Sequence, residues 1–134
     1  MEGIFTVKKA ASAMNGEVLN CGDCGDSVIK SVSTDTRTID GGALFFALHG
    51  ENSDGHRFIK AAAEAGAVCC VADDLSEVPQ GTAVIKVENT NRALLDLAGA
   101  YRREMKIPVV AVTGSVGKTS TRGMIASVLS QKYK

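Results

Sequence analysis

Short apolar runs alternate with amphipathic segments along most of this 134-residue chain. Three of the runs, residues 43–48, 67–72 and 82–87, have the length of buried strands, and glycines flank the first. Apolar residues recur at the spacing of a helix face between the first two runs, and again after the third. Strands that alternate with helices in this way predict an α/β fold.

The remaining residues of the first hundred fit the same scheme. Thr6 is a suitable N-cap for a helix that Asn15-Gly16 closes, and Gly66 stands where a helix C-cap glycine belongs. We therefore expect helices over residues 7–14 and 56–65 and after Asn89-Thr90, and additional strands over 17–20 and 27–33. The predicted core faces are Phe58, Ile59, Ala62 and Ala63 in the second helix, and Leu94, Leu95, Leu97, Ala98 and Tyr101 in the third.

The length of the chain allows one ordinary domain, or one small domain with a fragment of a second. We place a boundary at Ile107-Pro108, because proline disfavours helix in the residue before it. The apolar run Val109 to Val112 follows and is predicted to be a fresh buried strand. The sequence thus predicts one domain over residues 1–106 and the start of another over residues 107–134.

A glycine-rich motif follows this run directly and leads into a helical pattern. Its residues are Thr113, Gly114, Ser115, Val116, Gly117, Lys118, Thr119 and Ser120. A strand, a glycine loop, Lys-Thr and a helix form the context of a phosphate-binding loop. Backbone N–H groups of such a loop converge on an anion, and the helix N-terminus adds its positive dipole end. Lys118 is predicted to reach the outer phosphates of a nucleotide, and the Thr119 hydroxyl to ligate Mg²⁺.

The motif departs from its commonest form, because Val112 occupies the position of the first glycine. A glycine turn that merely starts a helix would explain Gly114 and Gly117. It would not explain a lysine followed by two hydroxyl residues at the same place. We therefore predict that the loop from Gly114 to Ser120 binds nucleotide phosphates.

Two other polar loops, residues 33–37 and 50–56, are each predicted to follow a strand. Ligand crevices in open α/β sheets form at such strand ends. Ordinary turns, with Ser53 or Asp54 capping the next helix, explain the same residues at least as well. His56 is expected to be a first-turn helix residue more often than a ligand or base.

Four cysteines fall into two pairs, Cys21/Cys24 and the adjacent Cys69-Cys70. Neighbouring strand residues point to opposite faces, so Cys69 and Cys70 cannot easily share one zinc ion, and no further motif completes a set of ligands. We expect two buried strand thiols and a cysteine-bearing turn, all reduced.

Charge is balanced overall but uneven along the chain, with net −6 over residues 1–100 and net +6 over 101–134. The basic end fits phosphate binding, and chance imbalance in a short segment explains it equally well. It lacks a basic stripe with interleaved aromatics, so no nucleic-acid partner is expected. No apolar run approaches the ~20 residues of a membrane span, and no secretion signal is readable. We expect a cytoplasmic protein.

Several separated strings together resemble the Mur ligases of peptidoglycan synthesis. They are STDTR (33–37), GGALFFALHGENSDGHRFIKAAAEAGA (41–67) and TGSVGKTSTRGMIASVL (113–129), in the family's order and over nearly the whole chain. The Thr-Gly-Ser-x-Gly-Lys-Thr loop is similar to that of the branch that adds D-Ala-D-Ala to UDP-N-acetylmuramoyl-tripeptide. The departures from the family's usual residues are Gly41, Ala43, Arg122 and Gly123.

The resemblance implies that residues 1–106 anchor the UDP part of the substrate and that residues 107–134 begin a central ATP-binding domain. It assigns the UDP part to Thr34, Thr36, Arg37, Asn52 and Ser53. It also implies ATP and Mg²⁺ as cofactors and Lys118 as a catalytic residue. The family phosphorylates a peptide carboxylate, and the amine of D-Ala-D-Ala attacks the resulting acyl phosphate. Other residues for that step would lie past Lys134, so the isolated chain is expected to be inactive.

Two alternatives stay open. One is a stand-alone nucleotide-binding or regulatory module, and the other is the family branch that adds the third amino acid of the peptide. The sequence fixes neither that third residue nor the oligomeric state. The segment from residue 107 could pack on the first domain, pair with another copy or remain mobile.

Overall fold

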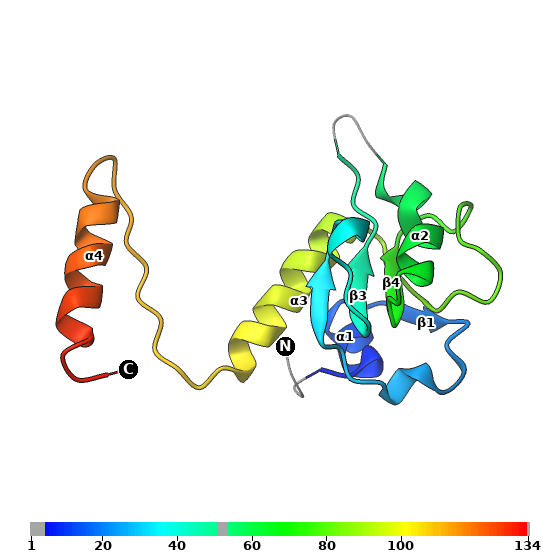
Figure 1. The fold of residues 1–134 in the computed structure, drawn as a ribbon, viewed down its shortest axis with the longest axis horizontal. Helices are drawn as coiled ribbons and strands as arrows, with labels where there is room; N and C mark the ends of the chain where they lie inside the picture. Colours follow the sequence, from blue (N-terminus) through cyan, green and yellow to red (C-terminus); the bar gives the residue numbers. More distant parts are fainter. Residues whose placement is uncertain (1–4, 51–53, 134) are drawn as a thin grey trace.

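A computed structural model describes residues 5–50 and 54–133 of the chain. Its centre is a five-stranded sheet with strand order β1-β5-β4-β3-β2 (Figure 1). Four neighbouring strands are parallel, and β1 pairs antiparallel with β5 at one edge. The strands are β1 (Glu17–Leu19), β2 (Ser31–Ser33), β3 (Ala43–Phe46), β4 (Cys69–Ala72) and β5 (Val84–Lys86). The expected α/β fold is confirmed.

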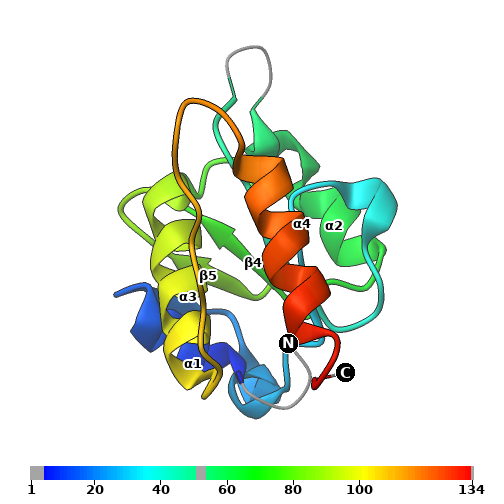
Figure 2. The same cartoon turned by 90° about the vertical axis from the view of Figure 1, so that its left-hand side faces the viewer.

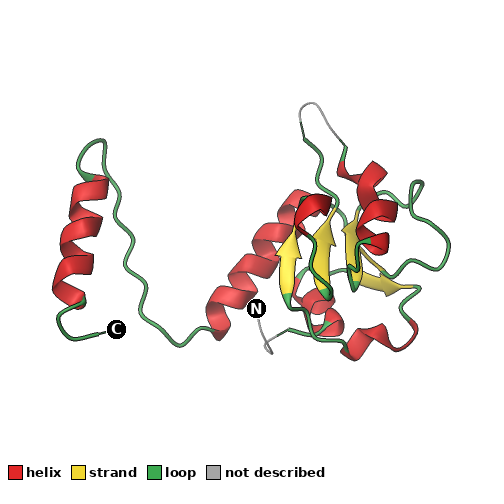
Figure 3. Ribbon diagram, in the orientation of Figure 1, coloured by secondary structure: helices red, strands yellow, loops and turns green. Residues whose placement is uncertain are grey.

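Helices connect the strands, as Figure 3 shows. The α-helices are α1 (Val7–Ala13), α2 (Ile59–Glu64), α3 (Thr90–Glu104) and α4 (Lys118–Leu129), and the 3-10 helices are η1 (Gly22–Asp26), η2 (Thr36–Thr38) and η3 (Gly55–Phe58). The Thr6 hydroxyl caps α1 by accepting a hydrogen bond from the Lys9 amide at 3.3 Å, as predicted. Asn89 caps α3 in the same way through the Arg92 amide.

Both faces of the sheet are buried. Helices α1 and α3 cover one face and α2 covers the other (Figure 2). Side chains alternate between these faces along each strand. The α1/α3 side receives Leu44, Phe46, Cys69, Val71 and Ile85, and the α2 side receives Phe45, Ala47, Cys70, Ala72 and Val84. This alternation explains why β3 and β4 consist of apolar residues without interruption.

One of the two cysteine pairs is in the predicted state and the other is not. Cys69 and Cys70 are free, buried and on opposite faces, as predicted, and burial raises the pKa of each thiol to about 12. Cys21 and Cys24, expected to be reduced, form a disulfide. The turn that begins η1 joins the Cys24 amide to the Cys21 carbonyl at 2.8 Å and brings their Cα atoms to 5.2 Å, within disulfide range.

Some predicted helix and strand residues lie elsewhere. The strand expected over residues 27–33 is confined to β2, with an isolated bridge between Thr6 and Val28 before it. Leu95, predicted to be in the core, is 68% exposed, and Ala98 is also exposed. Ala93 and Leu97 supply the buried stripe of α3, and a residue midway between them points away from it.

The segment after α3 forms no strand. Residues 109–112 pair with no described strand, and Val109 and Val110 are 60% and 70% exposed. An apolar run becomes a buried strand only beside a sheet edge, and Figure 1 shows this segment and α4 apart from the sheet. Among the described residues, no helix combines the length and apolar character needed to cross a membrane.

Candidate functional site

A pocket of about 480 Å³ lies beside the loop that follows the end of β2, next to β3 and η3. Its lining residues are Thr34, Asp35, Thr36, Arg37, Phe45 and Phe58. Three of the predicted UDP-binding residues, Thr34, Thr36 and Arg37, therefore share one concave surface. The other two, Asn52 and Ser53, fall outside the described residues. The pocket has the size of an ordinary small-molecule site.

Hydrogen bonds within the loop fix the polar side of this pocket. The buried Ser33 hydroxyl donates to the Asp35 carbonyl at 2.8 Å and accepts from the Asp35 amide at 3.1 Å. The Asp35 carboxylate then caps η2 by accepting from the Arg37 amide at 3.0 Å. Local side-chain bonds of this kind hold a polar turn in one conformation. The loop therefore presents Thr34 and Thr36 from a preorganised backbone.

Arg37 pairs with Asp35. Its Nη2 lies 2.6 Å from the Asp35 Oδ2, and its Nε donates to the same carboxylate. Hydrogen bonds from Arg37 lower the pKa of the Asp35 carboxyl to about 2, so the carboxylate stays ionised and its charge is compensated. Arg37 remains 87% exposed. Asp54, an acidic residue of the second polar loop, contacts His56 and His49 instead.

Two aromatic rings complete the pocket, and sequence reasoning missed them as site residues. Phe45 is buried in β3, whereas Phe58 is 47% exposed at the end of η3. The helical spacing predicts Phe58 in the core only if one regular α-helix begins at His56, whereas α2 begins at Ile59. The 3-10 turn rotates Phe58 away from the face that buries Ile59 and Ala62.

The glycine loop adopts the geometry expected at the start of a helix. Gly117 is the N-cap of α4 with a φ of 79°, and Gly114 has a φ of 152°, both conformations that favour glycine. The Lys118 Nζ donates to the Gly114 carbonyl, so the ammonium lies across the loop. A positive charge therefore stands beside the free amides of the α4 N-terminus.

A hollow of about 200 Å³ adjoins this loop. Lys118 and Thr119 line it together with Val110, Val112 and Arg122. Of the other predicted phosphate-binding residues, Ser115, Val116 and Ser120 are exposed but do not line the hollow. Arg122 was noted in the sequence only as a departure from a family pattern. Its position one helical turn after Lys118 is the signal that could have placed it here.

The pocket and the glycine loop are separate in this structure. The pocket lies against the sheet, and the loop lies at the beginning of α4 at the far end of the extended segment (Figure 1). Two regions suited to anionic or polar ligands therefore occur on two parts of one chain. The pocket and the hollow beside the glycine loop have no lining residue in common.

Comparison with known proteins gives a consistent result. The family described as "Mur ligase family, catalytic domain" matches residues 28–113. The UDP-N-acetylmuramoyl-tripeptide–D-alanyl-D-alanine ligase of Bacillus subtilis (strain 168) is 42% identical over 130 residues, which are 96% of this chain and 28% of that protein.

Solved structures agree with the sequence match. A crystal structure of MurF from Acinetobacter baumannii superposes with a TM-score of 0.81 at 33% identity, covering 96% of this chain and 28% of that one. MurF ligase from Thermotoga maritima in complex with ADP gives a TM-score of 0.69 at 29% identity, covering 80% and 25%. The chain thus spans about a quarter of the length of the proteins it matches.

Proposed function

Because the chain belongs to the Mur ligase family, we propose that it is part of a cytoplasmic ligase that uses ATP to join D-Ala-D-Ala to UDP-N-acetylmuramoyl-tripeptide. The similarity to D-alanyl-D-alanine ligases over 96% of the chain supports this branch. The single observation that carries the proposal is the pair of separate sites, one pocket at the strand ends and one phosphate-type loop. Residues 1–106 anchor the substrate, and residues 107–134 begin the ATP-binding domain.

The strand-end pocket is proposed to hold the UDP part of the substrate. The exposed ring of Phe58 offers an apolar face for the uracil, and base–aromatic stacking contributes about 1–3 kcal/mol. Thr34 and Thr36 carry hydroxyls that can hydrogen-bond the uracil or ribose. Arg37 faces the diphosphate. Its ion pair with Asp35 compensates the charge of that carboxylate, which therefore repels the phosphates less. Asn52 and Ser53 are proposed as further contacts.

The glycine loop is proposed to bind ATP through the amides of residues 114–120. Similarity to a MurF ligase in complex with ADP supports nucleotide binding. Lys118 reaches the outer phosphates once it leaves the Gly114 carbonyl, and it stabilises the charge that develops during phosphoryl transfer. Thr119 lines the same hollow as Lys118, so its hydroxyl would be able to hold a Mg²⁺ ion that accompanies the phosphate oxygens of ATP. When bound, Mg²⁺ supplies Lewis-acid polarisation of those oxygens.

The reaction needs an activated acyl group. A peptide carboxylate is a poor electrophile until one oxygen becomes part of a phosphate leaving group. Transfer of the ATP γ-phosphoryl group to the carboxylate gives an acyl phosphate and ADP. Attack by the D-Ala-D-Ala amine then forms the amide and releases phosphate. This chain positions the phosphoryl donor and anchors the acceptor, and the rest of the ligase supplies the remaining groups.

Titration with UDP, followed by amide chemical shifts, tests the anchor. Signals from residues 33–37 and 54–58 are expected to shift together. Phe58→Ala should weaken UDP binding by about tenfold, as loss of a stacked ring predicts, whereas Leu95→Ala on the exposed side of α3 should leave it unchanged. Shifts confined to Thr113–Ser120 would mean that the diphosphate is captured by the glycine loop, and they would refute the anchor.

A further inference from the structure

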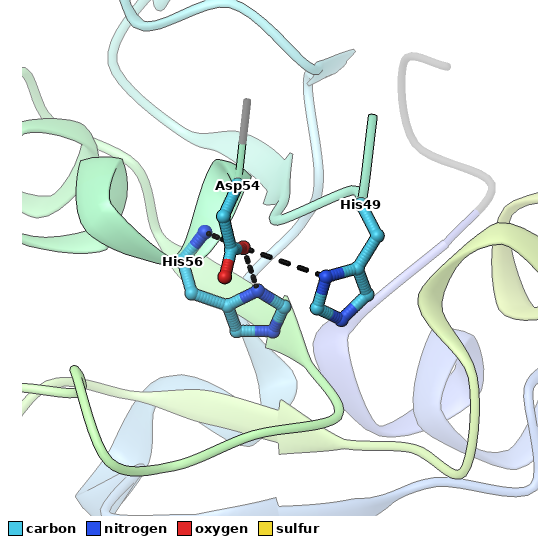
Figure 4. Close-up of side chains that lie close together, drawn as sticks. All are labelled: His49, Asp54 and His56. Atoms are coloured by element: carbon cyan, nitrogen blue, oxygen red, sulfur yellow. Dashed lines mark hydrogen bonds and ion pairs between the residues drawn. The ribbon is translucent and has the colours of Figure 1, made fainter. Parts of the chain in front are cut away.

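A cluster of two histidines and two aspartates lies outside both sites just described. His49 follows β3, Asp54 and His56 stand at the beginning of η3, and Asp73 follows β4. His56 is buried, and the His49 ring stacks on it with a centroid distance of 4.7 Å. Figure 4 shows the Nδ1 atoms of both rings directed at the Asp54 carboxylate. Two connections of the sheet, β3 to β4 and β4 to β5, thus converge on one point.

The carboxylates bracket the two rings. Asp54 Oδ1 lies 2.6 Å from the His56 Nδ1 and 3.6 Å from the His49 Nδ1. On the opposite side, Asp73 Oδ1 lies 3.0 Å from the His56 Nε2 and 2.9 Å from the His49 Nε2. Two of these contacts are hydrogen bonds, one from His56 Nδ1 to Asp54 and one between His49 Nε2 and Asp73, and the other two are approaches within ion-pair distance.

The hydrogens of the two rings are placed on different sides. A neutral imidazole carries one N–H and one acceptor nitrogen. The His56 Nε2 accepts from the Asp73 and Asp74 amides at 3.4 Å, so its Nδ1–H donates to Asp54, whereas the His49 Nε2 bonds to Asp73. The His49 Nδ1, 3.6 Å from Asp54, has a lone pair available on the side of the Asp54 carboxylate.

We propose that His49, Asp54 and His56 form a binding site for a divalent transition-metal ion of the zinc class. One ring nitrogen of each histidine and one carboxylate oxygen of Asp54 lie within 4.8 Å of one another. We assign the ligand nitrogens as Nδ1 of His49 and Nδ1 of His56, the atoms that face Asp54. Both Nε2–H groups then donate to Asp73. A carboxylate that accepts from the second nitrogen of metal-bound histidines is the usual device for fixing their orientation and tautomer.

The distances require small adjustments. Ligand atoms about 2.1 Å from a tetrahedral ion lie roughly 3.4 Å apart. The 3.6 Å separation of His49 and Asp54 already matches, whereas the 2.6 Å separation of His56 and Asp54 must widen. His49 and Asp54 are about half exposed, so both side chains have room to turn, and the His49 ring must leave its stacked position. His56 also exchanges two long 3.4 Å contacts from the Asp73 and Asp74 amides for the donation to Asp73.

The donor set decides which ion fits. Imidazole nitrogens suit zinc, copper, nickel and iron, whereas Mg²⁺ prefers oxygen ligands. Three protein ligands leave one position for water. The ion would tie the end of β3 to η3, and Asp73 would extend the connection to α3, because its Oδ2 accepts from the Thr90 amide at 3.1 Å. The site is therefore structural and distinct from the proposed Mg²⁺ site at Thr119.

Calorimetric titration of the 134-residue chain with Zn²⁺ tests this site. One ion per chain is expected, with no comparable response to Mg²⁺. His49→Ala and Asp54→Asn should each weaken Zn²⁺ binding by about tenfold or more, the size of effect typical of a metal site. Nitrogen chemical shifts of the imidazole rings should show that His56 changes to the Nε2–H tautomer when zinc binds.

Matched variants separate this site from other zinc-binding groups. Asp74→Asn removes a neighbouring exposed carboxylate, and the double variant Cys21→Ser/Cys24→Ser removes the disulfide-bonded cysteines. Both variants should retain full Zn²⁺ affinity. Circular dichroism checks that each variant is folded. If Asp54→Asn does not fold, the comparison of His49→Ala with the wild type tests the proposal. Absence of Zn²⁺ binding, or equal binding by wild type and His49→Ala, would overturn the proposal.

Discussion

Individual polar residues in the strand-end pocket perform two tasks at once. Asp35 caps the η2 turn through the Arg37 amide and also pairs with the Arg37 guanidinium. Ser33 is both donor and acceptor to the backbone of the same turn. Substitution of either residue therefore changes the shape of the pocket as well as its charge. Thr34 and Thr36 are the better positions for testing ligand contacts alone.

The Asp35–Arg37 pair predicts a specific pH response. Arg37 holds the folded-state pKa of Asp35 at about 2, below its ordinary value of about 3.9. The pair is therefore fully formed above the ordinary pKa and is lost as the pH falls through the folded value. Carboxyl carbon shifts should show a midpoint near 2 for the wild type, and a higher midpoint for Arg37→Ala. Arg57→Ala, on the next helical segment, should leave the Asp35 midpoint unchanged, and an unchanged midpoint in Arg37→Ala would contradict the pairing.

Lys118 carries a prediction for the full-length ligase. Lys118→Ala should reduce ATP-dependent turnover by several orders of magnitude, because positioned charge supplies much of the catalysis of phosphoryl transfer. Binding of UDP should stay nearly intact, since the strand-end pocket shares no residue with the glycine loop. Steady-state kinetics and UDP calorimetry on the same preparation provide the comparison. Loss of UDP affinity in a folded variant would contradict the separation of the two sites.

At the scale of elements, α3 shows how far sequence periodicity extends. The start of this helix after Asn89-Thr90 followed from the sequence, but its predicted core face was too wide, because Leu95 is exposed although it is as apolar as the buried Leu97. Only the sheet decides which leucine is buried. The strand expected at residues 109–112 failed for the same reason: β propensity states that a segment can pair, whereas pairing requires a neighbouring strand.

The two leucines provide a stability test of α3. Leu97 is 2% exposed in the main core and Leu95 is 68% exposed. Leu97→Ala should lower the free energy of unfolding by about 2–5 kcal/mol, because it leaves a cavity. Leu95→Ala removes the same atoms at the surface and should change it by about 0.5 kcal/mol or less. Urea unfolding followed by circular dichroism measures both, and equal losses would show that α3 packs in another orientation.

Considered as a whole, the molecule has a folded body and an exposed extension. No described residue from 107 to 133 is buried, and α4 contributes none to the core. The body could largely be predicted, because strand alternation and helix caps are local signals. The pocket was only half predictable: its polar loop was readable, whereas the contribution of Phe58 depended on a 3-10 turn. Three residues of the histidine cluster, His49, Asp54 and His56, are close in sequence, whereas the contribution of Asp73 depends on the neighbouring strand β4 and could not be read from the sequence.

Hydrogen exchange should separate these two parts. An isolated helix of 12 residues is marginal in water, because tertiary packing normally stabilises helices. Amides of α4 should therefore exchange close to unfolded rates, whereas those of α3 and β4 should be strongly protected. Mass-spectrometric exchange on the 134-residue chain resolves the segments. Protection of α4 equal to that of α3 would show that it packs on the body or on a second copy.

The chain alone is predicted to lack ligase activity. The side chains proposed for acyl phosphate formation are Lys118 and Thr119 alone, and the chain covers 28% of the length of the Bacillus subtilis ligase. Incubation with ATP, Mg²⁺, UDP-N-acetylmuramoyl-tripeptide and D-Ala-D-Ala should release no phosphate above the level without peptide substrate. The full-length ligase under the same conditions is the positive control. Saturable, peptide-dependent phosphate release by the short chain would show that it already contains a complete active site.

The antiparallel edge strand also determines when the body can form during synthesis. Glu17 of β1 pairs with Lys86 of β5, and Lys9 of α1 forms an ion pair of 2.7 Å with Glu104 at the end of α3. Elements early in the body therefore find their partners among its last ones. Until about residue 104 is clear of the exit tunnel, α1 and β1 lack the surfaces that bury them. Docking of α1 and β1 is thus expected to wait for the synthesis of α3.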